Sequence, residues 1–279
     1  MLDAGWPSSD STDLRVKSIW TKCKSLLFDH INFRLSNLVI LESMAQLNYC
    51  VAKFRIHRDK FTNLHTGFNE IMFEREKRIN PVISYQVKEI LESASNSNFV
   101  LFRGLDNVEA GIDKLLQSSR LLPDVMFCIA SANCSRSNLP SNVHLLNRWM
   151  SSSELAVLYD AADVVLGQLG NVGRINRTIA HKIFEGAYFG KPIIATKSEA
   201  LEEIFVNNSH IIFVDGDDNQ DLTTTISRVL KSTNLRAKLS SRIKTAYKDK
   251  ISQEVISKRF LEILSDKFDL RDTTTQQTE

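Results

Sequence analysis

From residue 98 onward, short runs of β-branched and apolar residues alternate with segments whose apolar residues recur at helical spacing. Such alternation is typical of βαβ units, which build a parallel sheet with helices on both faces. The apolar runs predicted as strands of this sheet are 98–105, 124–130, 142–147, 163–169, 191–196 and 210–216. The sequence therefore predicts an α/β fold with a doubly wound parallel sheet.

The two ends of the chain have different patterns. After the last predicted strand come three segments with helical periodicity, 221–232, 234–250 and 252–268, and then a polar stretch, 269–279, expected to be disordered. The first 96 residues predict a helical start, a strand in "NLVILES", a helix over 44–56 and a possible strand in "FTNLHTG". A self-sufficient doubly wound domain usually needs about 100 to 150 residues and several strands. We therefore expect an incomplete N-terminal domain whose strand "NLVILES" is unpaired and exposes apolar surface.

Composition excludes several classes of protein. The 35 basic and 33 acidic residues give a net charge of +2, so charge alone does not indicate nucleic-acid binding. The four cysteines have no metal-ligand spacing and lie in apolar surroundings, which indicates reduced and mostly buried thiols in a cytoplasmic protein. The sequence also predicts neither a leader peptide nor a membrane-spanning segment.

The stretch "HKIFEGAYFGKPIIAT", residues 181–196, sets a charged pair into an apolar helix, turn and strand. On a helical wheel, Lys182, Glu185 and Gly186 share the side opposite the apolar residues, and a residue without a side chain would let a ligand approach the helix backbone. Gly190 suits a left-handed helix end. The alternative is an ordinary solvated Lys/Glu pair, which contributes only a few tenths of a kcal/mol.

The longer run 163–205 resembles the donor-binding motif of GT-B glycosyltransferases of the large family 4, also called glycosyl transferases group 1. The residues that match this motif in order are Lys182, Glu185, Gly190, Lys191, Pro192 and Glu203. The resemblance extends over about 36–260, where the early part is similar to the end of an acceptor domain and a linker. It implies an incomplete acceptor-domain segment in 1–96, a donor-binding domain in 97–250, and a C-terminal helix and tail in 251–279.

In that family, the Glu matching Glu185 holds the ribose hydroxyls of a nucleotide sugar, and the Lys matching Lys182 lies towards the diphosphate. The resemblance implies transfer of a sugar from a UDP- or GDP-sugar to a hydroxyl of a glycan or lipid-linked acceptor, with retained configuration and no metal or other cofactor. It assigns no catalytic residue. The residues predicted to bind the donor are Arg103, Lys182, Glu185, Gly186 and Glu203.

Three departures from the family pattern bear on function. The family usually has a second Glu eight residues before the ribose-binding one, where this chain has Arg177. A Lys common after the first donor-domain strand is replaced by Ala110, and Arg103 is the predicted substitute. The early acceptor-domain strands have no counterpart. The alternative function is therefore an inactive or partner-dependent nucleotide-sugar-binding subunit that needs a chain supplying the missing domain.

Three further patterns have alternative interpretations. Asp215 and Asp217 form a D-x-D, but the composition of "VDGDDNQD" favours a turn with a helix cap at Asp218, so no metal is predicted. The basic helix 234–250 suggests peripheral contact with an anionic membrane, or else ordinary core packing beneath a solvated face. A dinucleotide oxidoreductase is disfavoured because "FRGLDN" lacks the G-x-G-x-x-G pattern.

Overall fold

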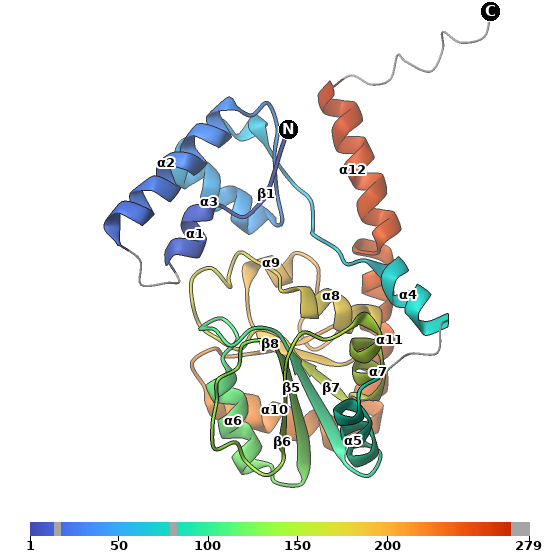
Figure 1. Ribbon diagram of the computed structural model, residues 1–279. Coiled ribbons are helices and arrows are strands. Elements are labelled where there is room, and N and C mark those ends of the chain that lie inside the picture. The colour runs from blue at the N-terminus through green and yellow to red at the C-terminus, as the bar shows by residue number, and fades with distance from the viewer. Residues whose placement is uncertain (14–17, 79–82, 269–279) are drawn as a thin grey trace, which may run out of the picture.

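The computed structural model describes residues 1–13, 18–78 and 83–268, which form two α/β units with one parallel sheet each. Figure 1 shows the smaller N-terminal unit in blue above the larger unit, with the long red helix α12 (Gln253–Phe268) rising beside both. The two units face one another across the carboxyl-end edge of the larger sheet.

The larger sheet has six parallel strands in the order β6-β5-β4-β7-β8-β9. Their bounds are β4 (Asn98–Arg103), β5 (Val125–Ser131), β6 (Val143–Asn147), β7 (Val164–Leu166), β8 (Ile193–Thr196) and β9 (Ile212–Val214). Chain order moves outward from β4 in one direction and then returns to start again at β7, so the topological switch point lies between these two strands. All six predicted strands are present, and the prediction of a doubly wound fold is confirmed.

Helices cover both faces of this sheet and divide its core into two apolar clusters. The helices are α5 (Tyr85–Ala94), α6 (Ile112–Leu121), α7 (Ser152–Ala161), α8 (His181–Tyr188), α9 (Glu199–Glu202), α10 (Asn219–Lys231) and α11 (Thr233–Lys250). The predicted capping box is present, because Ser151 and Glu154 cap one another's backbone at the start of α7. Arg148 adds two hydrogen bonds to Glu154 at 2.8 and 2.6 Å, which hold the pKa of this carboxyl at about 2.

The N-terminal unit is a three-stranded parallel sheet in the order β1-β2-β3. It consists of β1 (Leu2–Gly5), α1 (Ser8–Asp13), α2 (Ile19–Leu35), β2 (Val39–Leu41), α3 (Met44–Phe54), the 3₁₀ turn η1 (Arg58–Lys60) and β3 (Phe61–Asn63). The prediction that "NLVILES" is unpaired is wrong, since β2 is the central strand and is buried. The sequence analysis missed β1 because four residues with two apolar side chains show no usable period.

Exposed apolar surface does occur in this unit, but on α2 rather than on a strand. Among the side chains of α2, Asp29 and Phe33 are the buried ones, and Asp29 accepts hydrogen bonds from the backbone of Ser8 and Ser9 at 2.9 and 2.8 Å. The large apolar side chains of α2 that face solvent are Ile19, Trp20, Leu26, Leu27, Phe28, Ile31 and Leu35. An apolar face of this size on a helix marks a surface suited to association.

The two units are joined by α4 (Glu70–Arg78) and by α12, which returns to the first sheet. On α12, Ile263 is buried against Leu38 and Ile40. The predicted domain boundaries at residues 96 and 250 stay a prediction. Helix α5 lies before residue 97, yet its Val87 and Ile90 belong to the apolar core of the larger sheet. The stretch 269–279, expected to be disordered, lies outside the described residues.

Two expectations from composition concern the membrane and the thiols. Across the three described ranges, every helix is too short or too polar to span a bilayer. The four cysteines are free, with Cys50, Cys128 and Cys134 buried and Cys23 exposed. Burial raises the pKa of Cys50 and Cys128 to about 12, so these two thiols are unreactive.

Candidate functional site

A cavity of about 250 Å³ lies between the two units, at the switch point of the larger sheet. Trp6 and Glu42 line it from the N-terminal unit. From the larger unit, its charged and amide-bearing lining residues are Arg103, Asn107, Glu109, Gln168, Arg174, His181 and Lys182. Ligands of open α/β sheets bind in this position, and the mixture of charges suits a polar ligand.

Helix α8 brings the predicted Lys182 and Glu185 into a buried position rather than onto a solvated face. Their relative exposures are 6% and 5%, which excludes the alternative of an ordinary surface pair. The ammonium of Lys182 lies 3.8 Å from the centre of the Phe102 ring. Burial, with the nearby charge of Arg103, lowers the pKa of Lys182 to about 7. Burial thus destabilises the charged form of Lys182, and an anionic ligand beside it would stabilise that form.

Glu185 is fixed from two sides. Its Oε2 accepts a hydrogen bond of 2.6 Å from the hydroxyl of Tyr159, and its Oε1 lies 3.4 Å from Nη1 of Arg103. Burial, together with the charge of Glu185, raises the pKa of Tyr159 well above its usual value, so this hydroxyl stays a donor. Glu185 itself lines a neighbouring hollow with His181 and Thr66. The structure therefore brings the predicted Arg103, Lys182 and Glu185 together.

The predicted role of Gly186 is contradicted by its surroundings. A side chain at this position would meet Ile193 at 3.0 Å and Val165 at 3.3 Å, so Gly186 faces the sheet and not a ligand. The wheel assumed one apolar side, whereas α8 is buried almost all round. Gly186 permits close packing of α8 on β7 and β8, and Gly190 ends this helix with a φ of 64° as predicted.

Glu203 contacts the N-terminal unit instead of lining the cavity. Its two carboxylate oxygens accept hydrogen bonds from the backbone of Met44 at 2.9 Å and of Ala45 at 2.8 Å, at the first turn of α3. The nearby backbone amides of Glu199 and Ala200 donate hydrogen bonds to Asn176. The carboxylate of Glu203 therefore connects the larger unit to α3 of the N-terminal unit.

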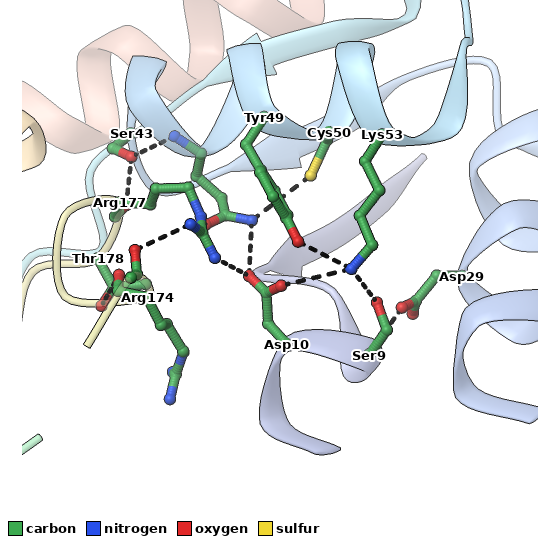
Figure 2. Close-up of polar contacts among 12 residues, drawn as sticks. Ser9, Asp10, Asp29, Ser43, Tyr49, Cys50, Lys53, Arg174, Arg177 and Thr178 are labelled. Atoms are coloured by element: carbon green, nitrogen blue, oxygen red, sulfur yellow. Dashed lines mark hydrogen bonds and ion pairs between the residues drawn. The ribbon is translucent and has the colours of Figure 1, made fainter. Parts of the chain in front are cut away.

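Arg177, which replaces the family's second Glu, is a second connection between the units. Figure 2 shows its guanidinium directed at Asp10, and the distance from Nη2 to Oδ2 is 3.3 Å. The same group stacks 3.8 Å from the centre of the Tyr49 ring, while Ser43 donates to the Arg177 carbonyl at 2.5 Å. On the far side of this network, Lys53 contacts Asp10, Tyr49 and Ser9. At this position the chain therefore has an ion pair between the two units.

Sequence reasoning missed four cavity residues: Glu42, Glu109, Gln168 and Arg174. Burial raises the pKa of Glu42 to about 7. Arg174 pairs with Glu109 at 3.1 Å, and its guanidinium lies 4.6 Å from the centre of the Trp6 ring. Glu42 and Gln168 come directly after β2 and near the end of β7, so the rule that ligands meet the carboxyl ends of strands was the available signal.

A second hollow of about 240 Å³ opens beside the cavity, at the ends of β4 and β5. Arg103 and Gly104 line both spaces. The second hollow also includes Arg148 and the highly exposed Trp149, so a cation and an aromatic face flank it. The two spaces therefore adjoin at Arg103 and Gly104, beside the switch point.

The remaining sequence patterns have structural roles. Asp215 accepts from the backbone of Asp217 and Asp218 caps α10, which confirms the turn. Within the described ranges no three His, Cys, Asp or Glu side chains form a group able to hold a metal. On α11, Leu239, Ile243 and Tyr247 are buried in the core, so this helix offers no apolar face to a membrane.

A family model described as glycosyl transferase-like matches residues 99–263, which is more than half of the chain. The chain belongs to this family. The match spans the six-stranded sheet and all of the cavity residues contributed by the larger unit. No curated protein sequence matches the chain.

Solved structures similar to the chain are GT-B glycosyltransferases. HepE of Anabaena in complex with UDP-glucose is 16% identical with a TM-score of 0.71, over 87% of this chain and 68% of that chain. Sucrose-phosphate synthase of Thermosynechococcus elongatus is 16% identical with a TM-score of 0.74, over 94% and 67% of the two chains. At 16% identity, this likeness shows a shared fold alone. This chain spans about two thirds of the length of each of the two proteins.

Proposed function

We propose that the protein transfers a sugar from a nucleotide donor to an acceptor hydroxyl, with the nucleotide bound at the switch point of the larger sheet. The observation that carries this proposal is the buried Lys182 beside Arg103 and Glu185, inside the region that matches the glycosyl transferase-like family. A buried cation with a lowered pKa beside a second cation suits the binding of a diphosphate. The UDP-glucose complex of HepE supports a nucleotide sugar as the donor.

Each part of a UDP- or GDP-sugar has a place in this proposal. Lys182 and Arg103 contact the diphosphate, and Glu185 accepts hydrogen bonds from the ribose hydroxyls. The base occupies the second hollow against Trp149, whose exposed ring offers a stacking surface. Gly186 and Glu203 have no part, for the reasons given above. The family 4 assignment and the retention of configuration remain parts of the proposal.

The chemistry needs no covalent intermediate on the protein. Negative charge grows on the leaving diphosphate as the bond to the sugar breaks, and the two fixed cations offset this charge. An oxygen of the leaving phosphate takes the proton of the acceptor hydroxyl, so the donor supplies the base. No metal and no catalytic side chain is proposed. The acceptor is a glycan or lipid-linked hydroxyl, and the four free cysteines support a reducing compartment such as the cytoplasm.

A thermal-shift screen with UDP, GDP and ADP tests the nucleotide site, because a ligand that binds the folded state raises the melting temperature. We expect one of the three to raise it in the wild type and to lose its effect in Lys182→Met. Hydrolysis or transfer of the matching nucleotide sugar then tests turnover. If none of the three nucleotides shifts the melting temperature, the proposal is wrong.

A second candidate is a nucleotide-sugar-binding subunit that works only with a partner chain. The observation that favours it is the exposed apolar face of α2, which suits association. This candidate predicts nucleotide binding by the isolated protein without sugar transfer, and transfer once a partner is added. Multiple turnovers by the purified monomer would exclude it.

A further inference from the structure

The side chain of Tyr159, on α7, reaches the candidate site from within the core of the larger unit. It is fully buried, and its hydroxyl donates to Oε2 of Glu185 at 2.6 Å. A phenylalanine would fill almost the same space without a polar atom, and burial of a hydroxyl is unfavourable unless it is hydrogen-bonded. The hydrogen bond to Glu185 therefore points to a role for this hydroxyl besides packing.

The ring of Tyr159 is held so that its hydroxyl keeps one direction. It stacks on Phe189, with the ring centres 5.2 Å apart and the ring planes 6° from parallel. Phe189 in turn packs edge-on against Phe73 of α4, with the ring centres 5.8 Å apart. A side chain in such close-packed surroundings keeps a single rotamer. One oxygen of Glu185 thus has a hydrogen-bond donor whose position is fixed by the core.

The second contact of Glu185 is longer and involves a more exposed partner. Nη1 of Arg103 lies 3.4 Å from Oε1, and 31% of the Arg103 side chain is exposed. Arg103 also lines both spaces of the site, where the proposed function places a diphosphate beside it. A guanidinium that turns to a phosphate gives up part of its contact with the carboxylate. Tyr159 is then the contact that still orients Glu185.

We infer that Tyr159 is a positioning residue, whose hydroxyl orients the carboxylate of Glu185 toward the ribose and thereby sets the selectivity of the site for a ribonucleotide over a dideoxynucleotide. The inference rests on the proposed function, because the ribose of the bound nucleotide is taken to lie at Glu185. Each carboxylate oxygen has two lone pairs, so Oε2 can accept from Tyr159 and still leave sites for the two neighbouring ribose hydroxyls. A carboxylate that is oriented before the ligand arrives loses less freedom on binding.

Loss of the Tyr159 hydroxyl should act mainly on the recognition of the ribose. In Tyr159→Phe the ring keeps its stacking on Phe189, whereas Oε2 of Glu185 loses its partner at 2.6 Å. The carboxylate can then turn toward Arg103, away from the direction in which the ribose donates. Lys182 is not touched by this change and keeps its contact with the diphosphate. The expected signature is a loss of selectivity rather than a general loss of binding.

Calorimetry on the full chain with a pair of nucleotides tests this signature. The probes are whichever of UDP, GDP or ADP binds and its 2′,3′-dideoxy counterpart, which lacks both ribose hydroxyls. We expect the wild type to bind the dideoxy form at least about 10-fold more weakly, the worth of a hydrogen bond to a charged group. Tyr159→Phe should reduce this ratio by about 2- to 10-fold, chiefly by weakening the ribonucleotide.

Tyr247→Phe is the matched control, because it removes a similar hydrogen bond away from the site. The hydroxyl of Tyr247 donates to Oε1 of Glu70 at 2.7 Å, and neither residue lines the cavity between the units. We expect this variant to keep the wild-type ratio. In a Glu185→Ala background, the further change Tyr159→Phe should leave the ratio as it is, because the tyrosine acts through the carboxylate.

The possible outcomes separate the inference from the proposed function. If no nucleotide binds the wild type, both fail. If a nucleotide binds but the wild type treats the two forms alike, the nucleotide site stands and the role of Tyr159 is refuted. That role is also refuted if Tyr159→Phe weakens both forms equally or weakens neither. The same conclusion follows if Tyr247→Phe lowers the ratio as much, or if Tyr159→Phe lowers it further in the Glu185→Ala background.

Discussion

Binding of a nucleotide sugar should protonate Lys182, and this proton can be counted. The apo protein holds the pKa of Lys182 at about 7 because the ammonium is buried beside Arg103. A diphosphate next to this group adds negative charge and restores the preference for the charged form. The pyrophosphate of a nucleotide sugar has no ionisation near neutral pH, so the ligand does not contribute a proton of its own.

The size of the effect follows from the two pKa values. With an apo pKa of about 7 and a bound value near the ordinary 10.5, the protein takes up about 0.9 proton at pH 8 and about 0.1 at pH 6. By linkage, affinity should fall by about tenfold per pH unit above pH 7.

Calorimetric titrations in buffers of different ionisation enthalpy measure this uptake directly. We expect uptake at pH 8 in the wild type and in the surface control Lys238→Met, and none in Lys182→Met. A wild type that takes up no proton at pH 8, or a Lys182→Met variant that takes up as much as the wild type, would refute the placement of the diphosphate.

Three further predictions concern affinity, acid stability and the contact between the units. Glu185→Gln and Lys182→Ala should each weaken nucleotide binding by about 1.5–3 kcal/mol in calorimetry while circular dichroism stays native, and unchanged affinity in both contradicts the site. Because the folded state holds the proton of Glu42 more tightly, its contribution to the free energy of unfolding should fall by about 3 kcal/mol as pH rises from 4.5 to 7. Denaturant titrations at several pH values should show that this pH-dependent component is absent in Glu42→Gln. If the variant and the wild type have the same profile of unfolding free energy against pH, the raised pKa is refuted. Arg177→Glu replaces one of the two cations beside the buried Asp10 with a like charge and leaves Lys53 as the other, so it should cost about 3–5 kcal/mol of stability, and an unchanged melting temperature contradicts the ion pair.

Local patterns predicted the larger sheet well because its strands are buried on both faces. Such strands appear as continuous apolar runs, and Phe99–Phe102 and Phe127–Ile129 are fully buried as those runs require. The four-residue β1 gave no such signal. The helical wheel failed for α8 because it assumes one solvated side, whereas Lys182, Glu185 and Gly186 are all buried by neighbours distant in sequence.

The candidate site was half predictable for a related reason. Lys182 and Glu185 share a motif, so order and spacing identified them, and Arg103 was predicted from its place at the end of the first strand of the larger sheet. Glu42 and Arg174 come from segments 132 positions apart, and only the docking of the two units brings them to one cavity. Glu203 matched the motif in order, yet its carboxylate caps α3, because order in sequence does not fix which partner a side chain meets.

The return of α12 to the first sheet sets the order in which the molecule can be finished during synthesis. Ile263 and Phe260 cover Leu38 and Ile40, so one side of the first sheet stays bare until roughly 200 further residues have been made. At about 5–20 residues per second, this interval lasts about 10–40 s. The N-terminal unit therefore leaves the ribosome before the larger unit but is completed after it, and for that time its apolar side is open to chaperones or to wrong partners.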